Sequence, residues 1–463
     1  MLKTLKIHMM ELFAIVTILA VHCIANSVFA VCPLGSTSQC FCIHDVIDCT
    51  RHRVNTTETF YPVPNSEYST LSLSGNFLRT VSNSSFKNLK IANLFLDNNL
   101  ISSIEFDAFN ELSPLLKVLN LENNKLTTIP KALMNLDVLS TLNLKKNPIT
   151  SVGFANGDAV FRHLGTSMRE FHFGDESQDF WPSTISHFQQ LRALYIYGTN
   201  MQVAPPHAFH SFERTLRELH ITNTQLSIVP NSIGELSRLE ELYFDDNINV
   251  GDQNIMSASF KSLAGTLHTL SLQNDSLTTF PKILFDLTTL HNLTMDRNKL
   301  WYISDDAVST LNSNITYLSF KQCNLDRIPQ SLLRITPLMF LDLTKNNIHS
   351  IERDDLGYLS HLRTLIVRKN PLKYVSTEVL RGMNSLSTID FSDSRLPDIP
   401  TAIVNAPTLR TLKFNNSPIS CTCDLKWYLS SPFRGKNMTI EGSCETINES
   451  IRDYLTYRVP RCP

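Results

Sequence analysis

Apolar residues return along most of the chain in one pattern, Leu-x-x-Leu-x-Leu-x-x-Asn-x-Leu. The clearest copies are LKVLNLENNKL, LSTLNLKKNPI, LHNLTMDRNKL and LMFLDLTKNNI. Fifteen copies can be written, and they begin at Tyr68, Ile91, Leu116, Leu139, Met168, Leu191, Leu216, Leu239, Leu267, Leu290, Ile315, Leu338, Leu362, Leu386 and Leu409. A repeat of this length predicts a solenoid in which each copy forms one coil.

The spacing of the copies is itself periodic. Steps of 23, 25, 23 and 29 residues are followed by 23, 25, 23 and 28, then by 23, 25, 23 and 24, with 24 and 23 at the end. A unit of four copies therefore recurs, as expected if the array grew by duplication of blocks.

The template gives each of its positions a place in a coil. Apolar residues at positions 4 and 6 point inward from a short strand, and those at positions 1 and 11 fill the same core. Asn at position 9, as at Asn124, Asn147 and Asn298, can bond neighbouring backbones where the chain leaves the strand. We expect a parallel β-sheet on the concave face, with short helices and irregular segments on the convex face.

Two segments are longer than the template requires. They cover Val152–Gly165 and Val250–Gly265, and the copy from Met168 has Glu176 where Asn is expected. We expect both segments to bulge outward on the convex or lateral side, because insertions there leave the strand ladder in register.

Four cysteines lie on each side of the array. They are Cys32, Cys40, Cys42 and Cys49 before it, and Cys421, Cys423, Cys444 and Cys462 after it. The end coils of a solenoid lack a neighbour, and each cysteine set lies where a cover is needed. Each set of four allows three disulfide pairings, and a zinc site is disfavoured by the Cys-x-Cys spacing and the expected export.

These cysteine sets, and the segment CTCDLKWYLSS in particular, resemble the capping modules of animal extracellular leucine-rich-repeat proteins. Slit proteins, Toll-like receptor ectodomains, chondroadherin and small leucine-rich proteoglycans are similar. The resemblance implies a leucine-rich-repeat solenoid (α/β horseshoe) with disulfide caps at both ends. It also implies the pairs Cys32–Cys42, Cys40–Cys49, Cys421–Cys444 and Cys423–Cys462.

The N-terminus is typical of a secreted protein. Lys3 and Lys6 precede an apolar run from Leu12 to Val21, and Val28-Phe29-Ala30 suits a signal peptidase. An uncleaved anchor is the alternative, but the run is short for a membrane span. We expect a signal peptide at 1–30, an N-terminal cap at 31–67, fifteen repeats without a domain boundary at 68–419 and a C-terminal cap at 420–463. We expect no membrane span and a secreted product.

Composition and motifs argue against several classes of function. A formal net charge of −2 gives no electrostatic argument for binding nucleic acid or an anionic membrane. No Gly-rich phosphate loop, Gly-x-Ser-x-Gly elbow or His-Glu-x-x-His motif occurs. Cys323 replaces Asn at position 9, so we expect a buried structural thiol. We therefore expect no enzyme, cofactor or metal.

Glycosylation sequons are distributed unevenly. They begin at Asn55, Asn83, Asn274, Asn292, Asn314, Asn415, Asn437 and Asn448. None begins between Asn83 and Asn274, which leaves repeats two to eight as one window without glycans. Because bulky sugars exclude partners, this window is where we expect a protein contact, although the gap can also arise by chance.

The candidate binding site follows from position 5, whose side chain points out of the concave face. In repeats five to eight this position carries four rings, His172, Tyr195, His220 and Tyr243. Tyr197 lies beside these rings, and the flanking candidates are Arg169, Arg192 and Arg217 on one side and Asp245 and Asp246 on the other. Tyr and Arg are concentrated at protein interfaces. The alternative is that the rings merely pack along the sheet and stabilise it.

A weaker candidate consists of Tyr317, Met339, Phe340 and Ile366, with sequons Asn292 and Asn314 nearby. The function expected from the whole pattern is binding of another extracellular protein, in matrix or signalling, through the concave face. The alternatives are a soluble immune-recognition protein for a glycan or lipid, and a non-catalytic subunit of a secreted enzyme.

Overall fold

The computed structural model describes residues 40–56, 68–83, 85–87, 89–301, 303, 314–357, 359–433, 438–447 and 449–463. The expected signal peptide, Cys32 and the sequon residues Asn437 and Asn448 lie outside these ranges. The chain divides into two compact units. The first consists of Met1–Lys125 and Pro130–Val138, and the second of Leu126–Ile129 and Leu139–Pro463. The division falls inside the array, where the sequence led us to expect no boundary.

The first unit contains the N-terminal cap and the first repeats. Strand β1 (Phe41–Ile43) pairs antiparallel with β2 (Val46–Asp48). From β2 the sheet continues in parallel through β3 (Thr70–Ser72), β5 (Asn93–Phe95) and β7 (Val118–Asn120). The return segments carry the strands β4 (Thr80–Val81) and β6 (Ser103–Ile104) and the 3₁₀ turns η1 (Asn110–Leu112) and η2 (Lys131–Asn135).

The second unit continues the pattern with one parallel strand per repeat. The strands are β8 (Thr141–Asn143), β9 (Glu170–Phe173), β10 (Ala193–Tyr197), β11 (Glu218–Thr222), β12 (Glu241–Asp245), β13 (Thr269–Ser271), β14 (Asn292–Thr294), β15 (Tyr317–Ser319), β16 (Phe340–Asp342), β18 (Thr364–Ile366), β20 (Thr388–Asp390) and β21 (Thr411–Lys413). Strand β22 (Thr439–Glu441) of the C-terminal cap pairs in parallel with β21. The parallel-sheet solenoid predicted from the repeats is confirmed.

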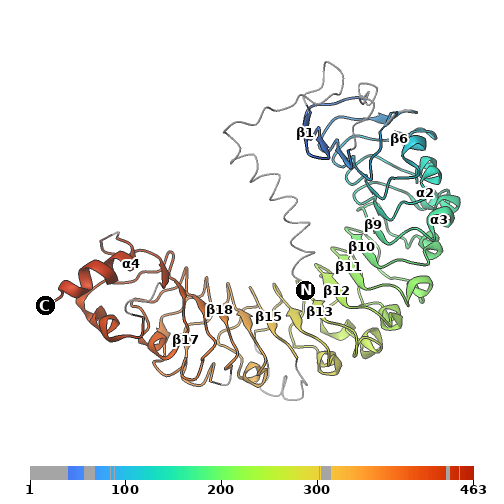
Figure 1. The fold of residues 1–463 in the computed structure, drawn as a ribbon. Coiled ribbons are helices and arrows are strands. Elements are labelled where there is room, and N and C mark those ends of the chain that lie inside the picture. Colours follow the sequence, from blue (N-terminus) through green and yellow to red (C-terminus); the bar gives the residue numbers. More distant parts are fainter. Residues whose placement is uncertain are drawn as a thin grey trace. The chain divides into compact units, whose positions relative to one another are not determined.

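The strands of the second unit line the inner side of a curve, and its helices lie on the outer side (Figure 1). The helical elements are α2 (Ser151–Ala155), α3 (Asp158–Leu164), η3 (Ser183–His187), η4 (His210–Phe212), η5 (Asn231–Glu235), η6 (Asp252–Asn254), η7 (Ser257–Phe260), η8 (Lys282–Asp286), η9 (Gln330–Arg334) and η10 (Thr401–Asn405). Strands β17 (Ser350–Ile351) and β19 (Tyr374–Val375) form a small separate sheet. Leu142 and Leu144, at positions 4 and 6 of their repeat, are almost completely buried, as the template requires.

The Asn at position 9 joins adjacent coils, as expected. The Asn298 amide donates to the carbonyls of Leu272 and Met295 at 2.6 and 2.9 Å. Its oxygen accepts from the backbone N–H groups of Asp275 and Leu277 at 3.1 and 3.0 Å. One buried side chain thus satisfies four backbone groups from two coils, none of which water can reach.

Both long insertions leave the strand ladder intact. The first forms α2 and α3, which bury Phe154, Phe161 and Leu164, while β8 and β9 remain paired. The second forms η6 and η7, while β12 and β13 remain paired. The prediction that these segments bulge away from the sheet is confirmed.

Disulfides hold both caps. The described pairs are Cys40–Cys49, Cys421–Cys444 and Cys423–Cys462, which are the pairs that the resemblance implied. The C-terminal cap is completed by η11 (Cys423–Ser430), α4 (Ile451–Asp453), the π-helical turn η12 (Tyr454–Arg458) and η13 (Val459–Arg461). Cys323 is a buried free thiol that donates to the Met295 carbonyl at 3.2 Å. Burial raises the pKa of this thiol to about 12, so it stays protonated.

We predict that Asn298→Ala lowers the free energy of unfolding by at least about 2 kcal/mol, because it leaves buried backbone groups without partners. Asn249→Ala is the control, since that side chain makes a single exposed hydrogen bond to Gln225. The control should change stability by no more than about 0.5 kcal/mol. Urea unfolding measures both variants, and equal midpoints would contradict the role given to position 9.

We predict that replacing Cys423 and Cys462 together by Ser lowers stability by about 2–5 kcal/mol, because the end of the solenoid loses its covalent closure. Cys323→Ser is the control, because position 9 already carries Ser394 and Ser417 in later repeats. Thermal unfolding compares the variants. Mass mapping of non-reduced peptides should recover the 421–444 and 423–462 bridges, and a bridge between the two caps would refute the assignment.

Candidate functional site

The four rings at position 5 of repeats five to eight form one continuous stack. His172 and Tyr195 are 4.0 Å apart between ring centroids, with an interplanar angle of 3°. Tyr195 and His220 are separated by 4.3 Å, and His220 and Tyr243 by 4.2 Å. The rings lie directly opposite one another in the registers of β9 to β12. Strands about 4.8 Å apart bring successive position-5 rings to stacking distance.

A row of carboxylates at position 3 holds the edges of these rings. Glu170 bonds Nε2 of His172 at 2.7 Å, and Glu241 accepts the Tyr243 hydroxyl at 2.7 Å. Glu218 receives both the Tyr195 hydroxyl at 3.0 Å and Nε2 of His220 at 2.7 Å. Because an ionised carboxylate can only accept, each ring presents an N–H or O–H to it.

Burial favours the uncharged forms of His172, Tyr195 and Tyr243. Desolvation lowers the pKa of His172 and outweighs the opposing effect of its bond to Glu170. Burial also raises the pKa of Tyr195 and of Tyr243, reinforced by the neighbouring carboxylates. At neutral pH the phenols therefore stay protonated and act as donors to the glutamates. The result is a preordered strip of rings bordered by the carboxylates of Glu170, Glu218 and Glu241.

The exposed part of the strip lies toward Tyr243. His172 is 8% exposed and Nδ1 of this ring is buried without a hydrogen-bond partner among the described residues. Tyr195, His220 and Tyr243 are half-buried. The expected column of rings is therefore present. His172 is its buried end, and Tyr195, His220 and Tyr243 are partly exposed to solvent.

The residues predicted on the flanks have different environments. Tyr197 is 36% exposed, and the Nζ atoms of Lys145 and Lys146 lie 5.9 and 5.4 Å from its ring centroid. These distances suit cation–π attraction. Lys145 and Lys146 therefore lie beside Tyr197 at the edge of the site, and sequence analysis had not included them.

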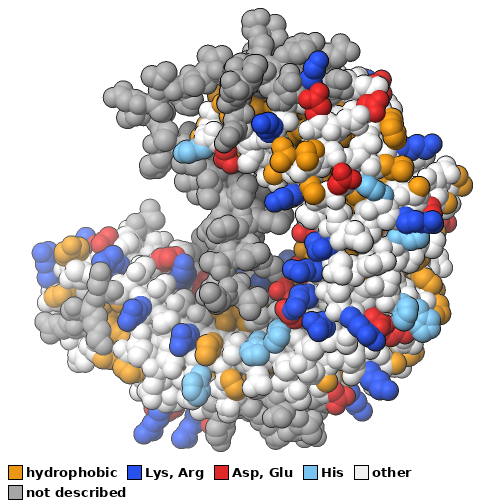
Figure 2. Space-filling model, turned by 45° about the vertical axis from the view of Figure 1, so that its right-hand side comes forward, with side chains coloured by type: hydrophobic (Ala, Val, Ile, Leu, Met, Phe, Trp, Pro, Cys, Tyr) orange, Lys and Arg blue, Asp and Glu red, His pale blue; other side chains and the backbone are white. Residues whose placement is uncertain are grey.

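On the arginine flank, Arg169 donates to the carbonyls of Thr166 and Met168, and Arg217 forms an ion pair with Glu240. Arg192 occupies the same column between them and is exposed. Figure 2 shows Lys and Arg side chains following one another along one margin of the repeats. This flank offers basic groups beside the rings.

On the acidic flank, Asp245 is 9% exposed and accepts from Ser271 at 2.6 Å and from the Gln273 N–H at 2.9 Å. Burial raises the pKa of this carboxyl. Asp246 pairs with Arg297 at 3.0 Å. Asp245 therefore acts mainly within the fold, and Asp246 is the more accessible of the two acids.

Glu170, Glu218 and Glu241 were missed in the sequence analysis, although their position 3 repeats as regularly as position 5. Side chains at positions 3 and 5 point to the same face of a strand. Reading the two columns together would have placed the carboxylates beside the rings.

The weaker candidate also forms a stacked pair. Tyr317 and Phe340 have ring centroids 4.5 Å apart, and Met339 is 37% exposed beside them. Asn292 lies directly opposite Tyr317 in the register of β14 and β15, and it is exposed. A glycan on Asn292 would cover this pair, which favours the first stack as the contact surface.

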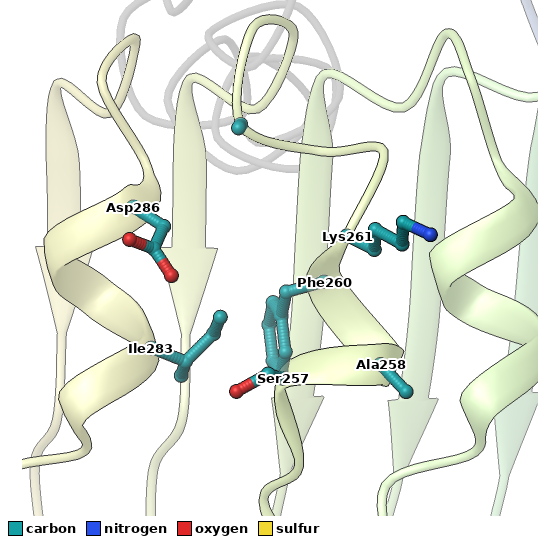
Figure 3. Close-up of a pocket in the computed structure, with 7 residues that line it drawn as sticks. Ser257, Ala258, Phe260, Lys261, Ile283 and Asp286 are labelled. Carbon is teal, nitrogen blue, oxygen red and sulfur yellow. The ribbon is translucent and has the colours of Figure 1, made fainter.

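A small pocket of about 320 Å³ lies on the outer side, between η7 and η8. Figure 3 shows Phe260 and Ile283 facing each other across it, with Lys261 and Asp286 at its margins. Phe260 is itself buried in the core. The pocket is a gap between two return segments and is remote from the ring stack, which lies on the strand face.

Family models and curated relatives agree with this fold. A leucine rich repeat model matches residues 90–149, and a BspA type leucine rich repeat region matches residues 202–336. Mouse podocan is 27% identical over 321 residues, which are 65% of this chain and 48% of podocan. The human volume-regulated anion channel subunit LRRC8A is 25% identical over 233 residues, or 50% of this chain and 28% of that protein.

Solved structures show the same architecture at low sequence identity. The TLR13–ssRNA13 complex superimposes with a TM-score of 0.60 at 19% identity, covering 87% of this chain and 64% of the other. A leucine-rich-repeat protein of Leptospira interrogans gives 0.56 at 19% identity, covering 90% and 94%. The chain is a leucine-rich-repeat protein. It is homologous to podocan and spans about half of podocan's length.

We predict that Gly174→Ala, directly after β9, lowers stability by about 3 kcal/mol or more. Gly174 has φ +130°, and an added Cβ would lie 1.9 Å from the carbonyl oxygen of Tyr197. Gly265→Ala is the control, since nothing lies within 4 Å of a Cβ there. The control should leave stability unchanged or raise it by about 0.4–1 kcal/mol. Thermal unfolding distinguishes them, and a tolerated Gly174→Ala would contradict the tight approach of β9 and β10.

Proposed function

We propose that this chain is a secreted, non-catalytic module that binds another extracellular protein, in matrix or signalling. The contact surface is the strand face of repeats five to eight. It comprises the ring stack of His172, Tyr195, His220 and Tyr243, with Tyr197 and the flanking charged residues Arg169, Arg192, Arg217, Asp245 and Asp246. The observation that carries the proposal is the ordered stack with its row of glutamates.

The chemistry of the stack suits a protein partner. Tyr and His present flat apolar faces together with hydrogen-bonding edges, a combination enriched at protein interfaces. Stacking and the glutamate bonds already fix the ring orientations, so little side-chain entropy is lost on binding. The site offers a partner charges of both signs. The glutamates border the rings, and the positive groups are Arg192 and the two lysines, Lys145 and Lys146, beside Tyr197.

The sequons support the same surface. Asn83 and Asn274 border a stretch of chain without sequons, and the stack lies inside it. Asn292 is on the strand face two strands beyond Tyr243 and would set one limit of the accessible surface. That these sequons carry glycans is part of the proposal.

Export is supported by the N-terminal sequence, the disulfides and the homology to podocan. Disulfides persist in oxidising compartments, which is where the caps require the chain to fold. No helix among the described residues combines the length and the apolarity needed to cross a membrane. Immune recognition of a glycan or lipid, and service as a non-catalytic enzyme subunit, are the alternatives from sequence. No particular contact of the stack favours either of them.

The test replaces Tyr195 and Tyr243 together by Ala. Partners are captured from the native extracellular fluid with the wild-type chain, identified, and titrated against both proteins. We predict a loss of affinity of at least about 2 kcal/mol, because buried Tyr side chains are typical interface hot spots. The loss in stability should be about 0.2–1 kcal/mol for each of the three stacked pairs broken, and it is measured separately by thermal unfolding.

Two further variants sharpen the result. Tyr195→Phe with Tyr243→Phe keeps the rings and removes the hydroxyl bonds to Glu218 and Glu241. Tyr317→Ala with Phe340→Ala removes the second ring pair and should leave affinity unchanged. A large loss of stability with unchanged affinity in the variant with Tyr195→Ala and Tyr243→Ala would make the stack a scaffold and eliminate the proposed site.

A further inference from the structure

A cluster of metal-binding side chains lies on the outer side of the second unit, away from the ring stack. His207, His210 and Glu213 belong to the return segment of the sixth repeat, in and around η4, and Glu235 ends η5 in the next repeat. One ligand atom each of His210, Glu213 and Glu235 lies within 4.8 Å of the other two. In the described part of the chain, no other group of three such residues is as close.

The four side chains already form two His–Glu contacts, and His207 reaches the cluster through Glu235. Nδ1 of His207 lies 2.8 Å from Oε1 of Glu235, and Nδ1 of His210 lies 3.0 Å from Oε2 of Glu213. Oε2 of Glu235 is buried and has no hydrogen-bond partner among the described residues. A buried carboxylate oxygen without a partner carries a desolvation cost that a cation would remove.

We propose that His207, His210, Glu213 and Glu235 form a binding site for a divalent transition metal of the Zn²⁺ class. Imidazole nitrogen and carboxylate oxygen are the donors that Zn²⁺ accepts at about 2.0–2.2 Å in tetrahedral sites. Two imidazoles exclude a Ca²⁺ or Mg²⁺ preference, because those ions select oxygen ligands alone.

The exposure of the two imidazoles leaves them room to close around an ion. The imidazoles of His207 and His210 are 71% and 72% exposed, whereas the side chains of Glu235 and Glu213 are 33% and 24% exposed. Two anchored carboxylates therefore face two rings that can change rotamer. Tetrahedral ligands stand about 3.3 Å apart, so the ligand atoms of His210, Glu213 and Glu235 need to approach by only about 1.5 Å. His207 would complete the set by a change of rotamer.

The two His–Glu pairs add little to stability by themselves. Exposed His–Glu pairs contribute only about 0–1 kcal/mol to stability. A bound ion would join the return segments of the sixth and seventh repeats, between which no strand pairing is described. The metal site is therefore also a clamp between two coils.

Isothermal titration of the metal-stripped full-length secreted protein with ZnCl₂ tests the proposal. We expect one ion per chain at this site and a melting temperature that rises with Zn²⁺ concentration. The double variant His207→Ala with His210→Ala should weaken this binding by at least about tenfold. Glu235→Gln, which preserves shape, should weaken it as well. Both variants should melt near the wild-type temperature without metal.

The matched control is His268→Ala with His291→Ala. These two exposed rings are 5.6 Å apart between centroids, close to the 6.2 Å between His207 and His210, but no described carboxylate groups with them as a ligand set. The control should bind Zn²⁺ like the wild type. Absence of stoichiometric binding to the wild-type protein, or equal binding by the His207/His210 variant, would overturn the proposal.

Discussion

Everything in this molecule depends on the fact that one coil cannot satisfy its own backbone. A coil of about 24 residues forms a strand of only three to five residues, and each strand needs partners on both sides. The Asn at position 9 extends this dependence to the turn, because it bonds carbonyl and N–H groups of its own coil and of the preceding one. The caps follow from the same constraint, since β1, β2 and β22 cover strands that would otherwise be unpaired.

The sequence was sufficient for the features that share this period. Strand positions, buried columns and the ring column all follow from counting along the template, so His172, Tyr195, His220 and Tyr243 could be placed side by side in advance. The cap disulfides came from resemblance, since spacing alone left three pairings open in each set of four. The hydrogen bonds and burial of individual side chains could not be predicted from template positions. Asp245 was predicted on the flank of the rings, but its carboxylate is buried and accepts a hydrogen bond from Ser271.

The return segments explain why other features escaped prediction. They differ in length and conformation from repeat to repeat, so no template position aligns His210 with Glu235. Their proximity depends on how η4 and η5 pack in adjacent coils, which only coordinates reveal. The same applies to Lys145 and Lys146 beside Tyr197, where two lysines follow β8 and the tyrosine ends β10.

The ring stack occupies all four repeats of the second block and none of the others. At the same position the first block has Ser72, Phe95, Asn120 and Asn143, and the third has Ser271, Thr294, Ser319 and Asp342. The flanking positions 4 and 6 remain apolar in all three blocks. A duplicated block thus inherits a finished core together with an outward column that can change without disturbing it. Divergence of that column alone is enough to give three copies of one scaffold three chemically different outward surfaces.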